Sequence, residues 1–141
     1  MTTIRLLLFS ILALAAITGC THNSDGPIDY QLGGGFSGVR TTVHIEPDGK
    51  VTRTKQNGSV DTTQLDAAAL GDLQGKVGEA QFPTLEPMYG CGGCADDVVH
   101  TISVRVDGSS YTVQADGSAD YPDRLRPLID ALSTMAKDPA P

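Results

Sequence analysis

Two segments of the chain place apolar or β-branched residues at nearly every second position, and this period of two limits the fold more than any other feature. The segments are residues 39–46, VRTTVHIE, and residues 98–106, VVHTISVRV. Successive side chains of a β-strand point to opposite faces, so each segment predicts a strand with one buried and one solvated face. Such strands are typical of antiparallel sheets that are covered on one side only.

Three shorter segments predict further strands. Residues 28–32 alternate before a run of glycines, residues 51–56 follow the turn Pro47-Asp48-Gly49-Lys50, and residues 111–115 follow the turn Asp107-Gly108. Proline presets one backbone dihedral of a turn and glycine accepts positive φ, so both turns are strongly indicated. The sequence therefore predicts about four to five strands.

Two other segments carry the period of an amphipathic helix. Residues 63–66, TQLD, resemble a capping box, and apolar residues recur every four positions over residues 65–77. A second apolar stripe follows Pro122 and covers residues 125–135. The order β-β-β-α-β-β-α predicts an α+β fold, in which an antiparallel sheet of about four to five strands has two helices packed on one face.

The first twenty residues predict export and lipidation. Arg5 precedes an almost uninterrupted apolar run at residues 6–17, and Ile17-Thr18-Gly19-Cys20 resembles the lipobox of bacterial lipoproteins. The run is shorter than the roughly 18 apolar residues that a membrane span requires. We therefore expect residues 1–19 to be a signal peptide, and Cys20 to carry a diacylglycerol and a further fatty acid such as palmitate.

Lipidation also predicts where the mature domain is held. Each buried methylene contributes about 0.8 kcal/mol, so two or three acyl chains anchor a protein stably. Residues 20–27 are then the lipidated cysteine and a short polar tether. The expected location is the cell membrane or outer membrane, with the domain outside the cytoplasm.

The mature chain is small and acidic. Removal of residues 1–19 leaves 122 residues, which suits one domain with an ordinary core. It has 9 basic and 17 acidic residues and no basic run, which disfavours nucleic acid as a partner. No feature of the sequence indicates a cofactor.

Cys91 and Cys94 form a C-x-x-C motif that has three interpretations. A redox-active pair is disfavoured because Asp96 and Asp97 follow it, and nearby carboxylates oppose the reactive thiolate. A zinc site is disfavoured because no second pair of ligands has similar spacing, although His100 is near. A structural disulfide suits a chain in an oxidising compartment, so we expect Cys91 and Cys94 to pair.

No grouping of residues predicts catalysis. Residues 33–38 match the spacing G-x-G-x-x-G, but a strand rather than a helix is expected next, which disfavours a nucleotide site. None of the three histidines belongs to a Ser-His, Cys-His or H-E-x-x-H pattern. His100 falls on the apolar face of its strand, where we expect a hydrogen-bonded structural histidine. We therefore predict a protein that is not an enzyme, with no catalytic residue and no metal site.

Five short motifs follow one another between residues 34 and 128. They are Gly34-Gly35-Phe36-Ser37-Gly38, a Leu- and Ala-rich helix at residues 65–77, Phe82-Pro83-Thr84-Leu85, a hairpin at residues 98–113, and the closing segment 122–128. In this order they resemble the emfourin family, protein inhibitors of thermolysin-like (M4) metalloproteases. The likeness covers residues 28–136, an emfourin-like α+β domain, and leaves residues 137–141 as a C-terminal tail.

The resemblance implies a non-catalytic binding protein that occludes a secreted metalloprotease. In such a protein a rigid loop fills the substrate cleft without presenting a good scissile bond. The candidate loops are the glycine turn and residues 88–97, although the Cys91–Cys94 loop departs from the family pattern. The candidate partner-binding residues are Gly34, Gly35, Phe36, Met88, Tyr89, Gly92 and Gly93.

A second interpretation is a structural or assembly lipoprotein of the cell envelope without inhibitory activity. One fold serves many functions, so the same domain could instead dock to an envelope complex. Both interpretations share the membrane as a partner, through the lipid anchor on Cys20.

Overall fold

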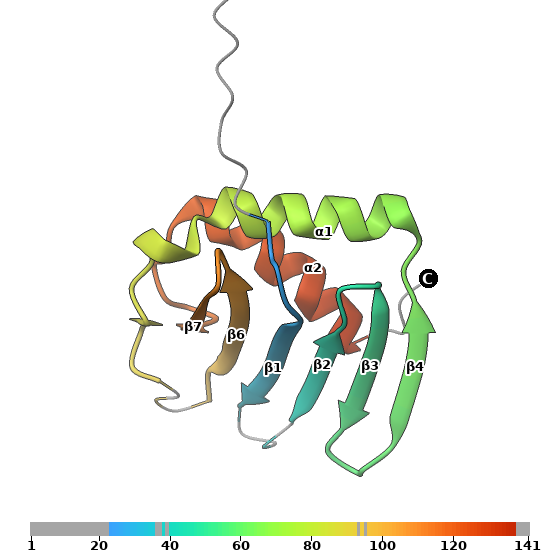
Figure 1. The fold of residues 1–141 in the computed structure, drawn as a ribbon. Helices are drawn as coiled ribbons and strands as arrows, with labels where there is room; N and C mark the ends of the chain where they lie inside the picture. The colour runs from blue at the N-terminus through green and yellow to red at the C-terminus, as the bar shows by residue number, and fades with distance from the viewer. Residues whose placement is uncertain (1–22, 36–37, 39, 93, 95, 138–141) are drawn as a thin grey trace, which may run out of the picture.

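The computed structural model describes residues 23–35, 38, 40–92, 94 and 96–137 (Figure 1). In this part of the chain, seven strands form one sheet in the order β4-β3-β2-β1-β6-β7-β5. The strands are β1 (Ile28–Gly34), β2 (Thr41–Ile45), β3 (Lys50–Lys55), β4 (Val60–Gln64), β5 (Met88–Tyr89), β6 (Val98–Val106) and β7 (Ser109–Asp116). The helices are α1 (Ala67–Ala80) and α2 (Arg126–Lys137), and two short 3-10 helices are η1 (Phe82–Thr84) and η2 (Asp123–Leu125).

The fold is α+β, but the prediction of four to five antiparallel strands is wrong. The sheet has seven strands in the described residues, and it is mixed because β5 pairs with β7 in parallel. Two strands were missed. β4 has one large apolar residue, Val60, and polar residues at its other four positions, whereas β5 is only two residues long.

The predicted start of the first helix is also wrong. Thr63 and Gln64 belong to β4, and α1 begins three residues later, at Ala67. Asp66 is the N-cap, and its carboxylate accepts a hydrogen bond of 2.7 Å from the backbone N–H of Ala69. An aspartate that accepts a hydrogen bond from an unpaired amide of the first turn favours the start of a helix. The predicted segment therefore does contain the N-cap, but the N-cap is Asp66 and not Thr63.

The two faces of the sheet differ sharply. One face packs against α2, which contacts β1 and β2, while α1 packs on α2 and η2 and crosses one end of the sheet (Figure 1). The other face is lined by polar side chains, which include the hydrogen-bonded pair of Asp29 and His44, whose Oδ1 and Nδ1 atoms are 2.6 Å apart. The strand residues buried in the core are Ile28, Tyr30, Leu32, Val43, Ile45, Val51, Ile102, Val104, Val106, Val113 and Ala115.

The chain enters the sheet at the end crossed by α1, and Ser24 forms an isolated bridge with Val106 there. Two further hydrogen bonds hold the chain at this end. The backbone N–H of Asp25 donates to the carbonyl of Arg105 (3.0 Å), and the carboxylate of Asp25 accepts from the N–H of Gly108 (2.6 Å). No helix among the described residues is long and apolar enough to span a membrane.

Candidate functional site

The two loops that the sequence singled out lie side by side, at the end of the sheet opposite the one where the chain enters. Gly34 pairs with Val98 across β1 and β6, and the backbone N–H of Gly35 donates to the carbonyl of Asp97 at 2.9 Å. The glycine turn is therefore joined to the loop that leads into β6. We call the described residues among 33–35 and 88–98 the loop edge.

Gly34 makes this junction sterically possible. Its φ is +88°, in the region that favours glycine, and a Cβ placed there would lie 2.4 Å from the carbonyl oxygen of Asp97. Real Cβ atoms essentially never make contacts this short, so any larger residue would separate the two loops. The glycine run therefore allows two backbones to approach closely, which the sequence pattern alone could not assign.

Asp116, at the end of β7, binds the loop that contains Cys91 and Cys94, which we call the cysteine loop, to the sheet. Its Oδ2 atom accepts a 2.7 Å hydrogen bond from the backbone N–H of Cys91, and only 2% of the residue is exposed. Gly90 leaves room for this carboxylate, because a Cβ at Gly90 would lie 2.4 Å from Oδ2. The Oδ1 atom is buried without a partner among the described residues. A buried carboxylate of this kind stabilises the loop position only as long as the Cys91 amide stays in place.

Cys91 and Cys94 lie at disulfide distance, with their Cα atoms 5.6 Å apart. The cysteine loop also presents Met88, whose side chain is 48% exposed, while Tyr89 packs partly against the core. The Tyr89 hydroxyl accepts a hydrogen bond from the backbone N–H of Glu86 at 2.9 Å. Met88, in β5, is thus an exposed apolar residue next to the Cys91–Cys94 loop.

The predicted residues do not all fall in the described part of the chain. Gly34, Gly35, Met88, Tyr89 and Gly92 belong to the loop edge. Phe36, Gly93 and the lipidation residue Cys20 lie outside the described residues. The sequence therefore identified both loops, but the pairing between β1 and β6 that joins them was not foreseen.

His100 lies directly behind the loop edge and is hydrogen-bonded, as its place in the strand predicted. Its Nδ1 atom is 2.7 Å from the hydroxyl oxygen of Tyr30, a core residue that is 2% exposed. Burial lowers the pKa of His100, and the positive charge of Lys137 lowers it further, partly opposed by Asp130. The imidazole is therefore held neutral between the core and the loop edge.

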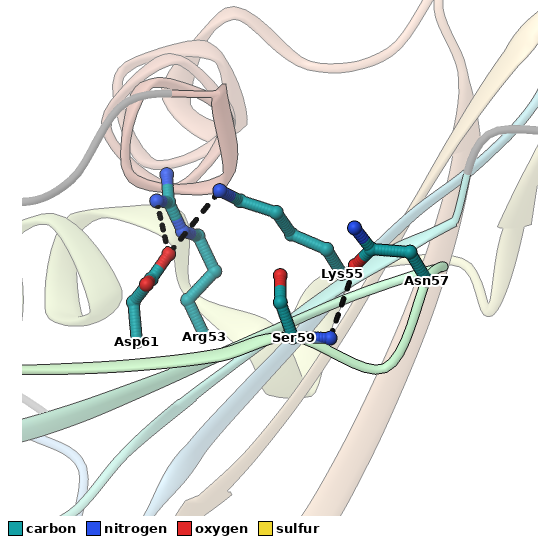
Figure 2. Close-up of polar contacts among 5 residues, drawn as sticks. All are labelled: Arg53, Lys55, Asn57, Ser59 and Asp61. Atoms are coloured by element: carbon teal, nitrogen blue, oxygen red, sulfur yellow. Dashed lines mark hydrogen bonds and ion pairs between the residues drawn. The ribbon is translucent and has the colours of Figure 1, made fainter.

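A second polar cluster, unforeseen from the sequence, joins β3 to the edge strand β4 (Figure 2). Figure 2 shows Arg53 and Lys55 converging on the carboxylate of Asp61, with nitrogen–oxygen distances of 2.6 and 3.3 Å. Arg53 faces the helix side of the sheet and is 5% exposed, and its Nε and Nη1 atoms have no partner among the described residues. The two cations lower the pKa of Asp61. The signal in the sequence was the alternation of Val51 and Arg53, which placed an arginine on the buried face.

No group of three or more His, Cys, Asp or Glu residues that could hold a metal ion occurs in the described part of the chain. No protein-family model and no curated protein matches the chain.

Proposed function

We propose that this chain is a membrane-anchored bacterial lipoprotein whose domain is a non-catalytic binding module, and that its loop edge occludes the substrate cleft of a secreted metalloprotease. The observation that carries the proposal is the hydrogen bond between the Gly35 amide and the Asp97 carbonyl. It joins the two loops that were selected from the sequence.

The loop edge is braced in a way that suits an inhibitor. Asp97 is held through Gly35, and Cys91 is held through the buried carboxylate of Asp116. A loop that is ordered before binding loses less conformational entropy when it enters a cleft, which favours affinity. A braced loop also resists the local rearrangement that peptide cleavage requires, so it would block a protease without becoming a substrate.

The position of the tether supports presentation of this edge to a soluble partner. Ser24 bridges Val106 at one end of β6, and Gly34 pairs with Val98 at the other end. Strands rise about 3.4 Å per residue, so these two points are separated by roughly 27 Å. A lipid on Cys20, close to Ser24 in sequence, would then hold the membrane end of the domain and leave the loop edge facing away from the bilayer.

The proposal can be tested by titrating the purified mature protein against a panel of M4-type metalloproteases while measuring hydrolysis of a peptide substrate. We expect stoichiometric loss of activity with at least one protease. Met88→Asp, on the loop edge, should weaken inhibition at least tenfold. Val60→Asp, at an exposed site on β4, is the matched control and should leave inhibition unchanged. Full activity of every protease at micromolar concentrations of the protein would contradict the proposal.

A structural or assembly role is the second candidate, and the edge strand β4 favours it. β4 is the outer strand beside β3, and its Val60 is 58% exposed. Free strand edges can accept an additional strand from another protein. Crosslinking in intact cells through a photoreactive residue at position 60 would test this role, because capture of an envelope component there, and not at position 88, would favour assembly over inhibition.

A further inference from the structure

The face of the sheet opposite α2 carries two rows of polar side chains that run across the strands. Each row takes one residue from each of the neighbouring strands β4, β3, β2, β1, β6 and β7. The strand register gives the first row as Thr62, Thr52, His44, Asp29, Ser103 and Thr112. It gives the second row as Val60, Thr54, Thr42, Gln31, Thr101 and Gln114. Both rows lie within the described part of the chain.

The two rows carry almost no charge. Asp29 and His44 are their ionisable members, and these two side chains are hydrogen-bonded to each other. The other members are threonine, serine, glutamine and one valine, although the chain has 17 acidic and 10 basic residues. Depletion of charged residues distinguishes the centre of an interface from ordinary protein surface. The composition of this face therefore favours contact with a neutral partner.

An open trough of about 390 Å³ lies between the two rows, over β2, β1 and β6. Its walls are Asp29, His44 and Ser103 from the first row and Gln31, Thr42 and Thr101 from the second. Tyr30 and Val43 also line the trough, and their side chains belong to the core on the other face of the sheet. The trough is therefore walled by polar side chains along both of its sides.

Hydrogen bonds within the rows hold some of these side chains in place. Oγ of Ser103 lies 2.8 Å from Oγ1 of Thr112, in addition to the contact between Asp29 and His44. The side chains of Gln31 and Thr42 make no hydrogen bond with another described residue. An amide and a hydroxyl can each donate and accept, as can the hydroxyl groups of a sugar. Gln31 and Thr42, which are neighbours across β1 and β2, are thus suited to bind sugar hydroxyls.

The spacing of the rows indicates which kind of sugar chain fits. Neighbouring strands lie about 4.8 Å apart, so each row presents one side chain at this interval. An extended chain of β-1,4-linked sugars advances by a similar distance with each ring, so successive rings would meet successive strands. An α-1,4-linked chain coils and does not keep this alignment.

We propose that the trough binds an extended, neutral β-1,4-linked glycan that lies across the strands, with one ring over each of β2, β1 and β6. Gln31 and Thr42 hydrogen-bond to hydroxyl groups of adjacent rings, and Asp29 and His44 contact the glycan from the opposite wall. The inference goes beyond the proposed function and does not depend on it, because the trough shares no residue with the loop edge.

Cellohexaose and maltohexaose are matched probes, because both are glucose hexamers and they differ in linkage. Each is titrated into the isotope-labelled mature protein and followed by NMR at pH 7. With cellohexaose we expect saturable shifts of the amides of Gln31, Thr42 and Thr101, with a dissociation constant below about 1 mM. Maltohexaose should bind at least fivefold more weakly. Cellobiose, which reaches over two strands, should bind at least tenfold more weakly than cellohexaose.

Two substitutions locate the site. Thr42→Lys places a long charged side chain in the trough and should weaken cellohexaose binding at least fivefold. Thr134→Lys, at an exposed position of α2 on the other side of the sheet, is the matched control and should leave binding unchanged. Gln31→Ala removes an amide without adding bulk and should weaken binding at least threefold.

Equal binding of the two hexamers would overturn the proposal, as would shifts scattered outside the trough or no saturable shift at about 10 mM cellohexaose. Unchanged binding by Thr42→Lys would also overturn it. Protease inhibition without glycan binding would leave the proposed function standing while this inference fails. Glycan binding without inhibition of any protease would give the reverse result.

Discussion

The hydroxyl group of Tyr30 lies 2.7 Å from Nδ1 of His100, and this contact joins the middle of the core to the back of the loop edge. The two rings are also stacked, with their centroids 6.1 Å apart and their planes inclined by 27°. Burial raises the pKa of Tyr30, so its hydroxyl stays protonated and can donate to a neutral imidazole. The neutral form of His100 is therefore the one that suits the folded protein.

Stability should consequently fall in mild acid. The pKa of His100 is lower in the folded protein than its ordinary value of 6.5, so the unfolded chain takes up a proton first as the pH falls. The contribution of His100 is complete above pH 6.5 and is lost as the pH falls through the folded pKa. Urea denaturation at pH 8, 7, 6 and 5 should show a larger loss for the wild type than for His100→Gln. Parallel pH profiles for the two proteins would exclude this role.

The junction of the two loops predicts an unusually costly glycine substitution. Gly34→Ala would place a Cβ 2.4 Å from the Asp97 carbonyl oxygen, at a φ of +88°. Gly58→Ala is the matched control, because Gly58 has a φ of +81° but nothing within 4 Å of the position that a Cβ would take there. Both variants bear the cost of positive φ, about 1 kcal/mol, and Gly34→Ala should lose about 2 kcal/mol more. Equal losses in urea denaturation would show that the loops separate freely.

The Arg53–Asp61 pair predicts an asymmetry between its two members. Asp61→Asn weakens the ion-pair partner that the described residues give to a guanidinium that is 5% exposed, whereas Arg53→Met leaves Asp61 able to turn toward water. Asp61→Asn should therefore reduce the free energy of unfolding more than Arg53→Met does. Thermal denaturation of the two variants at equal protein concentration measures the difference. The reverse order would mean that the buried arginine finds other acceptors.

Pairing of Cys91 with Cys94 predicts a small effect on stability. The closed loop spans a sequence separation of 3, for which the chain-entropy model gives about 2 kcal/mol. Mass spectrometry after alkylation without a reductant should find both cysteines unmodified in protein from an oxidising compartment. The double variant Cys91→Ser/Cys94→Ser should unfold at a urea concentration lower by the equivalent of about 2 kcal/mol. Complete alkylation of both thiols would show that they are free.

The sequence predicted elements whose signal is local. β6 alternates over most of its length, residues 111–115 of β7 alternate, and α2 has a clear apolar stripe, so each was recognisable from its own residues. β4 was not, because Asp61, Thr62 and Thr63 lack the apolar residues that mark a strand. β4 forms because its backbone pairs with β3 in the sheet, and this tertiary effect cannot be read from the composition of β4.

The candidate site also has features that the sequence predicted and features that it did not. The glycine run and the C-x-x-C motif are visible in the sequence, and each pointed to a loop. Their contact depends on the register between β1 and β6, which sets Gly34 opposite Val98. The register between strands does not follow from a local pattern.

The place of β1 in the sheet has a consequence for how the protein can be made. Among the described residues, β1 is the first strand to be synthesised, yet it lies between β2 and β6, and β6 begins only at Val98. While the intervening chain is still being delivered, one side of β1 has no hydrogen-bonding neighbour and remains open to wrong partners. Pairing on that side of β1 must therefore wait until β6 has emerged, so a nascent or truncated chain that stops before β6 should need a chaperone to stay soluble.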